Sequence, residues 1–265
     1  MKRLSLPLMT AVGLMGMTAL TGCGSGSTDS ATSASAAMTP SASSTPSPSS
    51  TLSGTVTVLA AASLTESFTA LEKSFEAANP GVDVTISFGS SATLAQQIAQ
   101  GAPADLYASA GTKALDQLPA EAKAKPTTTL AKNVLEIATP PGNPKKVTGL
   151  ASLADASTNV VLCAETVPCG SAADAVLTKA GVTAHVVSRE VDVKATLAKI
   201  TLGEADAAIV YHSDVVAAGS KVEGVEIPSA QNTTLAYPLV RLTDTAATKA
   251  FADLLASAAG LKELE

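Results

Sequence analysis

Four short polar segments each lie between an apolar, strand-like run and a helix-like run, a pattern typical of anion-binding sites. These segments are Ser63, Ser91, Cys169-Gly170-Ser171 and Asp192-Val193. The first amide N–H groups of a helix have no partner within the helix, and the helix dipole adds partial positive charge there. Helix starts combined with serine hydroxyls can therefore hold a fully ionised anion without a counter-charge. For each serine alone, the interpretation as an ordinary N-cap stays open.

Four further polar residues have a structural interpretation. Asp105 is expected to cap amides at the end of a strand, and Asp214 is expected to cap a helix. His212 is predicted to lie at the surface and His185 in a strand. Neither histidine has a spacing to the cysteines that is typical of a metal site.

Strand and helix patterns alternate along the chain from residue 55. Strands are expected at residues 55–59, 82–88, 104–108, 133–138, 160–163, 184–188, 207–211 and 235–242. Helices are expected at residues 64–75, from 91 to about 100, at 150–153, 171–179, 193–202 and 246–255. This alternation predicts βα units and a mostly parallel sheet with helices on both faces. The pattern breaks at residues 140–144 and then restarts, which predicts two α/β lobes.

The N-terminus has the features of a bacterial lipoprotein signal. Lys2 and Arg3 precede an apolar run that ends in Leu-Thr-Gly and Cys23. We therefore expect a signal peptide over residues 1–22 and a lipid on Cys23, with an N-terminal membrane helix as the alternative. Residues 23–53 are rich in Ser, Thr, Ala and Pro, which predicts a disordered tether after the lipidated cysteine.

Charge and length restrict the class of partner. The formal net charge is −6, and it becomes −8 when Lys2 and Arg3 are removed with the signal. An acidic chain is a poor partner for nucleic acid, so none is expected. We predict a protein outside the cytoplasm that is anchored to the cell membrane by the lipid on Cys23, with residues 54–265 available to fold.

Two cysteines remain in the predicted mature part. Cys163 and Cys169 are six positions apart. An oxidising compartment favours a disulfide between them. Two reduced, buried thiols are the alternative, and a metal site is a weaker one.

Five segments resemble the molybdate-binding proteins of bacterial ABC importers, in the same order over roughly residues 55 to 260. They are 58–64 (VLAAASL), 88–94 (FGSSATL), 101–106 (GAPADL), 167–170 (VPCG) and 209–214 (IVYHSD). The resemblance implies an α/β, two-lobed periplasmic-binding-protein fold of class II with a hinge. Lobe I is expected to comprise residues 54–134 plus 237–265, and lobe II residues 135–236.

The resemblance also implies how an oxyanion is bound. Ser63 and Ser91 are expected to donate through their side chains, Cys169 and Val193 through their backbone amides, and Tyr211 through its hydroxyl. Relatives have alanine where this chain has Cys169, but a backbone contact should tolerate the change.

The implied function is binding of molybdate or tungstate and delivery to an ABC permease and ATPase, by a monomer without a cofactor. The chain has no Trp, three Tyr and four Phe, and only Arg189 and Arg241 lie beyond the signal, which disfavours sugars and amino acids. A site made only of donors disfavours a protonated phosphate, whereas sulfate stays the alternative. A serine hydrolase built on Ser63 or Ser91 would need a Gly-x-Ser-x-Gly elbow, which the sequence lacks, so we expect no enzyme.

Overall fold

A computed structural model describes residues 52–263 of the 265-residue chain. The predicted signal peptide, the lipidation site at Cys23 and nearly all of the predicted tether lie outside these residues. Within residues 52–263, no helix combines the length and the apolar character that a membrane span requires.

The described strands form one mixed sheet. Their bounds are β1 (Gly54–Ala61), β2 (Val82–Gly89), β3 (Leu106–Ala108), β4 (Thr127–Thr139), β5 (Val160–Cys163), β6 (Val186–Glu190), β7 (Ala207–Tyr211), β8 (Glu223–Glu226) and β9 (Thr234–Arg241). The order is β2-β1-β3-β9-β4-β7-β5-β6, and β8 pairs with β4. Strand β1 is parallel to β2 and β3, and β5 is parallel to β6 and β7, whereas β4 and β9 are antiparallel to their neighbours.

Strand β4 connects the two parallel groups. Residues 127–134 pair with β9, which in turn pairs with β3 of the first group. Residues 135–139 pair with β7 and β8 of the second group. The strand therefore changes partners between Val134 and Leu135. The lobe limits given above stay a prediction.

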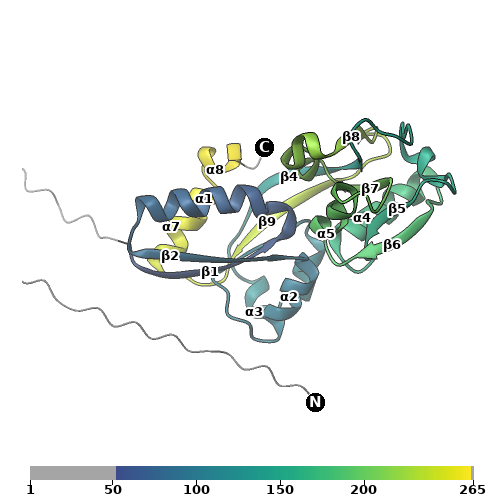
Figure 1. Cartoon of the computed structure of the whole chain (residues 1–265). Coiled ribbons are helices and arrows are strands. Elements are labelled where there is room, and N and C mark those ends of the chain that lie inside the picture. Colours follow the sequence, from purple (N-terminus) through teal and green to yellow (C-terminus); the bar gives the residue numbers. More distant parts are fainter. Residues whose placement is uncertain (1–51, 264–265) are drawn as a thin grey trace, which may run out of the picture. The chain divides into compact units, whose positions relative to one another are not determined.

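Helices cover the sheet, as a mostly buried α/β architecture requires (Figure 1). The α-helices are α1 (Thr65–Ala78), α2 (Ser91–Ala99), α3 (Ala120–Lys123), α4 (Pro168–Ala180), α5 (Val193–Thr201), α6 (His212–Ala218), α7 (Ala246–Leu255) and α8 (Ala258–Glu263). Short 3-10 turns are η1 (Ala62–Leu64), η2 (Lys113–Gln117), η3 (Leu150–Ala154) and η4 (Gly219–Lys221). In Figure 1, α1 and α7 lie on one side of β1 and β2, and α2 and α3 lie on the other.

Helix α1 shows how the sequence produces this packing. Phe68, Leu71 and Phe75 recur at spacings of three and four residues and are all buried. They form the apolar stripe of an amphipathic helix. The ring of Phe75 packs on Phe251 of α7, with centroids 5.0 Å apart. This contact fixes α1 and α7 relative to each other.

The predicted βα units are present, with differences at particular boundaries. Strands β5 and β7 and helix α7 have the predicted limits. Strand β4 begins at Thr127 instead of residue 133, because its exposed threonines pair with β9. Helix α4 begins at Pro168 instead of Ser171, since proline is favoured in the first helical position. The short elements α3, α8 and β8 were not predicted, and of α6 only a cap at Asp214 was expected.

Candidate functional site

A small cavity of about 20 Å³ brings together all five residues that the sequence singled out. Its lining includes Ser63 of η1, Ser91 of α2, Cys169 of α4, Val193 of α5 and Tyr211 at the end of β7. Pockets for drug-sized ligands have volumes of roughly 300–1,000 Å³. The cavity therefore has room for a small ion rather than for a sugar.

Strand direction explains why these residues meet. Strands β1 and β2 are parallel, and so are β5, β6 and β7. Within each group the carboxyl ends of the parallel strands lie together, where the following helices begin. The two groups run in opposite directions, so their carboxyl ends face each other near residues 134–135 of β4, where that strand changes partners. Each cavity residue lies at such an end or shortly after it. The cavity is consequently surrounded by helix starts.

The hydroxyl of Tyr211 is buried in this cavity without a partner. Its side chain is 1% exposed, and no described residue forms a hydrogen bond with the hydroxyl. A buried polar group without a hydrogen bond is costly, so such groups are rare in folded proteins. Burial raises the pKa of Tyr211 well above its usual value of 10.0. The phenol thus stays protonated and can act as a donor.

Ser91 is oriented by two hydrogen bonds. Its Oγ accepts from the amide of Ala110 at 2.9 Å, and its carbonyl accepts from the hydroxyl of Tyr107 at 2.7 Å. Burial raises the pKa of Tyr107 to about 12, so this phenol also remains a donor. Because the Ser91 oxygen is already accepting from Ala110, its own proton is free to point into the cavity.

Ser63 is part of a chain of hydroxyl groups. Its Oγ lies 2.9 Å from the hydroxyl of Tyr237, which accepts from the side-chain amide of Asn133 at 3.4 Å. Because the Asn133 amide donates to the phenol oxygen, the phenol can donate its own hydrogen bond to Ser63 Oγ. The hydroxyl of Ser63 is then free to donate a hydrogen bond to a ligand. Burial raises the pKa of Tyr237, which keeps this chain protonated.

The two backbone donors belong to the first turns of α4 and α5. Helix α4 begins at Pro168, so Cys169 follows in its first turn, rather than in a turn that precedes the helix as predicted. Helix α5 begins at Val193, and the N-cap Asp192 accepts from the amide of Ala195 at 2.9 Å. Neither the Cys169 nor the Val193 amide has an acceptor within its own helix.

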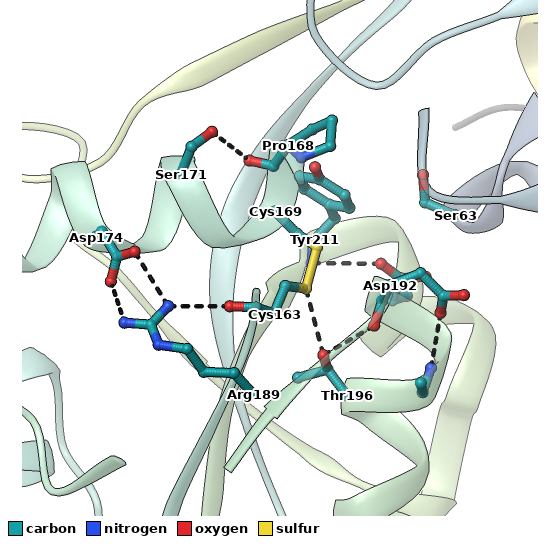
Figure 2. The surroundings of a disulfide bond; sticks show 12 residues. Ser63, Cys163, Pro168, Cys169, Ser171, Asp174, Arg189, Asp192, Thr196 and Tyr211 are labelled. Carbon is teal, nitrogen blue, oxygen red and sulfur yellow. Dashed lines mark hydrogen bonds and ion pairs between the residues drawn. A yellow bond between two sulfur atoms is a disulfide. The ribbon is translucent and has the colours of Figure 1, made fainter. Parts of the chain in front are cut away.

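A disulfide fixes the start of α4. The structure joins Cys163, the last residue of β5, to Cys169, with the Cα atoms 5.8 Å apart. Figure 2 shows the bridge next to the ring of Tyr211, with Ser63 approaching from a different segment. A Cβ atom at Gly170 would collide with the carbonyl of Ala164. Glycine therefore permits the close approach of α4 to the end of β5.

One ammonium group lies behind the cavity lining. Lys194 Nζ is 2.7 Å from a carboxylate oxygen of Glu66 and 3.0 Å from Asp214 Oδ1. Asp214 also accepts from the amide of Tyr211 at 3.3 Å, so it caps α6 as the sequence predicted. Burial raises the pKa of Asp214 to about 6, although Lys194 and the Tyr211 amide lower it. Sequence reasoning did not find this ion pair because its partners are far apart in the chain.

Two polar residues of the cavity lining were not predicted as site residues. Ser90 lies in the lining, and so does Asp192, which was considered only as part of a helix start. Asp192 adds an acceptor to the lining. The donor-only character expected of the five predicted residues stays a prediction. Both residues immediately precede a helix, and this position is the signal that would have identified them.

The remaining candidates lie away from the cavity. Asp105 accepts from the Thr57 amide at 2.8 Å and from the hydroxyl of Thr243, as expected of a strand-end cap. His185 lies 3.2 Å from the carbonyl of Thr158, and His212 pairs with Glu136 at 2.6 Å. Among the described residues no histidine lines the cavity, and residues 52–263 contain no cluster of three metal-ligating side chains.

The sequence matches the family described as bacterial extracellular solute-binding protein over residues 56–265. The chain belongs to this family. This solute-binding protein is 38% identical over 215 residues to the molybdate-binding protein ModA of Mycobacterium tuberculosis strain H37Rv, covering 80% of this chain and 82% of that protein.

Solved structures have the same fold. The substrate-binding domain of a putative molybdenum ABC transporter from Clostridium difficile is 31% identical, with a TM-score of 0.59 over 79% of this chain and 95% of that one. The sulfate-binding protein SubI of Mycobacterium tuberculosis has a TM-score of 0.67 at 21% identity, over 79% of this chain and 84% of that one. The latter likeness concerns the fold alone. The predicted periplasmic-binding-protein fold is confirmed.

Proposed function

We propose that this solute-binding protein binds molybdate or tungstate outside the cytoplasm and delivers it to an ABC importer. The observation that carries the proposal is the buried, unpaired hydroxyl of Tyr211, which shares one small cavity with Ser63, Ser91 and two helix starts. An oxyanion would satisfy this hydroxyl and accept from the other donors. The similarity to the mycobacterial ModA supports molybdate as the ligand.

In this proposal each of the five residues has one role. Ser63, Ser91 and Tyr211 donate their hydroxyl protons, and Cys169 and Val193 donate their backbone amides. Helix dipoles add partial positive charge at the last two positions. The dianion is thereby bound by preformed dipoles and needs no arginine or lysine in contact with it.

Asp192 determines which competitors have to be tested. Its Oδ1 accepts from the Ala195 amide and is occupied by this capping bond. The other carboxylate oxygen would accept a hydrogen bond from a protonated anion in the cavity. Hydrogen phosphate and sulfate are therefore the two competitors, the first because of this acceptor and the second because it has the same charge as molybdate.

The proposal also covers attachment and partners. We place a lipid on Cys23, with residues 24–53 as the tether that holds the folded part at the membrane. Delivery would involve a permease and an ATPase subunit.

The protein would act as a monomeric binding protein without enzymatic activity, since the serines of the cavity have no histidine base beside them in the described lining.

A thermal-shift titration with four anions tests the ligand. Molybdate or tungstate at a thousand times its dissociation constant should add about 4 kcal/mol to the free energy of unfolding. Sulfate at equal concentration should shift the melting temperature little, and the shift with hydrogen phosphate measures whether the Asp192 carboxylate admits a protonated anion. Equal shifts with sulfate would refute the specificity, and no shift with any of the four anions would refute the function.

A further inference from the structure

Ser90 is a second serine in the cavity lining, next to Ser91. Ser90 is 9% exposed, and its Oγ is buried and has no hydrogen-bond partner among the described residues. Ser90 also lines the cavity that contains the unpaired Tyr211 hydroxyl. Two unpaired buried hydroxyls therefore lie in the lining of one small cavity.

The position of Ser90 makes the missing hydrogen bond unexpected. It is the N-cap residue of α2, where a serine oxygen ordinarily accepts from an amide in the first helical turn. Ser90 forms no such side-chain bond. Its backbone carbonyl accepts from the amide of Leu94 at 3.0 Å, so the helix start is formed without help from the hydroxyl.

Ser91 differs from Ser90 because Ser91 is already hydrogen-bonded within the protein. The Ser91 oxygen is already accepting from Ala110, and its carbonyl from Tyr107, so this residue is fixed in one orientation. Ser90 has no comparable side-chain restraint, and its hydroxyl is free to turn toward whatever occupies the cavity.

We propose that Ser90 donates a hydrogen bond to the bound oxyanion, as an additional ligand-contacting residue beside Ser63, Ser91 and Tyr211. This inference rests on the proposed function. A tetrahedral oxyanion has four oxygens, each able to accept more than one hydrogen bond, so a fourth hydroxyl donor has an acceptor available. This hydrogen bond would satisfy the Ser90 hydroxyl, which is costly to bury without a partner when no ligand is bound.

Two measurements on Ser90→Ala separate a ligand contact from a helix cap. The probe is sodium molybdate, titrated by calorimetry into the purified full chain and into the variant. Loss of one hydrogen bond to an anion should weaken binding by roughly ten- to a hundredfold. The melting temperature without ligand should stay the same or rise, because the variant removes an unpaired buried hydroxyl.

Ser171→Ala is the matched control. Ser171 lies two residues after Cys169 near the same site, but its hydroxyl donates to the carbonyl of Pro168 at 3.2 Å and it is not part of the cavity lining. The affinity of the Ser171→Ala variant for molybdate should stay within about twofold of that of the wild type.

The outcomes are distinct. Wild-type affinity in Ser90→Ala would overturn the role of Ser90 and leave the proposed function intact. A lower melting temperature of the unliganded variant with unchanged affinity would identify Ser90 as a helix cap and overturn the inference as well. Failure of the wild type to bind molybdate would overturn both the proposed function and this inference.

Discussion

The ammonium group of Lys194, one residue after Val193, lies 2.7 Å from the carboxylate of Glu66, three residues after Ser63. The same ammonium group lies 3.0 Å from Asp214, which is three residues after Tyr211. One cation therefore holds together the three segments that provide Ser63, Val193 and Tyr211 to the cavity. It does so without lining the cavity itself.

Lys194→Met should destabilise the protein in a pH-dependent way. Asp214 is fully buried, and the variant would leave its carboxylate without the cation. Breaking a buried ion pair costs about 3–5 kcal/mol, and we expect roughly 2–3 kcal/mol at about pH 8 because a quarter of the Lys194 side chain is exposed. Denaturant unfolding at several pH values measures the effect.

The sign of the pH dependence follows from Asp214. Its pKa in the folded protein is raised from 3.8 to about 6, so the folded state binds more protons than the unfolded state between these values. The contribution of Asp214 to stability therefore falls as the pH rises from about 4 to 6. Removing the cation raises this pKa further. The cost of Lys194→Met should thus be largest at about pH 8 and smallest at about pH 5.

Lys199→Met is the control for Lys194. Lys199 pairs with Glu204 at 2.7 Å on the surface, where solvent screens the ion pair and leaves it little effect on stability. Its effect should be small at both pH values. A cost of Lys194→Met that does not change with pH would contradict the assignment of Asp214 as the buried partner.

Gly170→Ala should destabilise the protein and weaken ligand binding together. The new methyl group would collide with the carbonyl of Ala164, so α4 would have to move away from β5, at a cost of about 1–3 kcal/mol. The Cys169 amide moves with the helix. In Gly89→Ala the Cβ would meet only Leu94, at 3.8 Å, so stability should change by less than about 0.5 kcal/mol. Equal unfolding midpoints for the two variants would disprove the close approach at Gly170.

Removal of the disulfide should cost stability more than affinity. The double variant Cys163→Ala, Cys169→Ala opens a short loop, which is worth about 2 kcal/mol in the chain-entropy account. Molybdate affinity should fall only a few-fold, because Pro168 still starts α4 and presents the amide. Alkylation and mass spectrometry of the non-reduced wild type should detect neither cysteine as a free thiol. Detection of two free thiols would show that the bridge does not form.

The sequence predicted most of the fold because the βα units carry local signals. Alternating strand and helix patterns predicted β5, β7 and α7 with their observed limits, and small or capping residues, Ser90 and Asp192, precede α2 and α5 at the cavity. The start of α4 was misplaced because Pro168 was taken as part of a turn. The short elements α3, α8 and β8 lack a long periodic pattern and depend on tertiary packing.

The periodic patterns that predict strands and helices do not by themselves identify the site residues. Ser63, Ser91, Cys169, Val193 and Tyr211 came from the resemblance and the helix starts, and the structure places all of them around one cavity. Ser90 was missed because only one serine of the pair was expected to contact the ligand. Lys194 was missed because an ion pair with Glu66 spans 128 positions, which no local pattern reveals.

Calorimetric titration of molybdate into the wild type, Tyr211→Phe and Ser91→Ala tests the central claim most directly. Each substitution removes one hydroxyl donor to a buried anion, and such a bond is worth roughly 1.5–3 kcal/mol. We therefore predict a tenfold to hundredfold weaker affinity for each variant, with Tyr211→Phe no less stable than the wild type because it removes an unpaired buried hydroxyl. Asp105→Asn, which alters a strand-end cap away from the cavity, should bind molybdate within a few-fold of the wild type. Wild-type affinity in both hydroxyl variants would show that molybdate is not bound in this cavity.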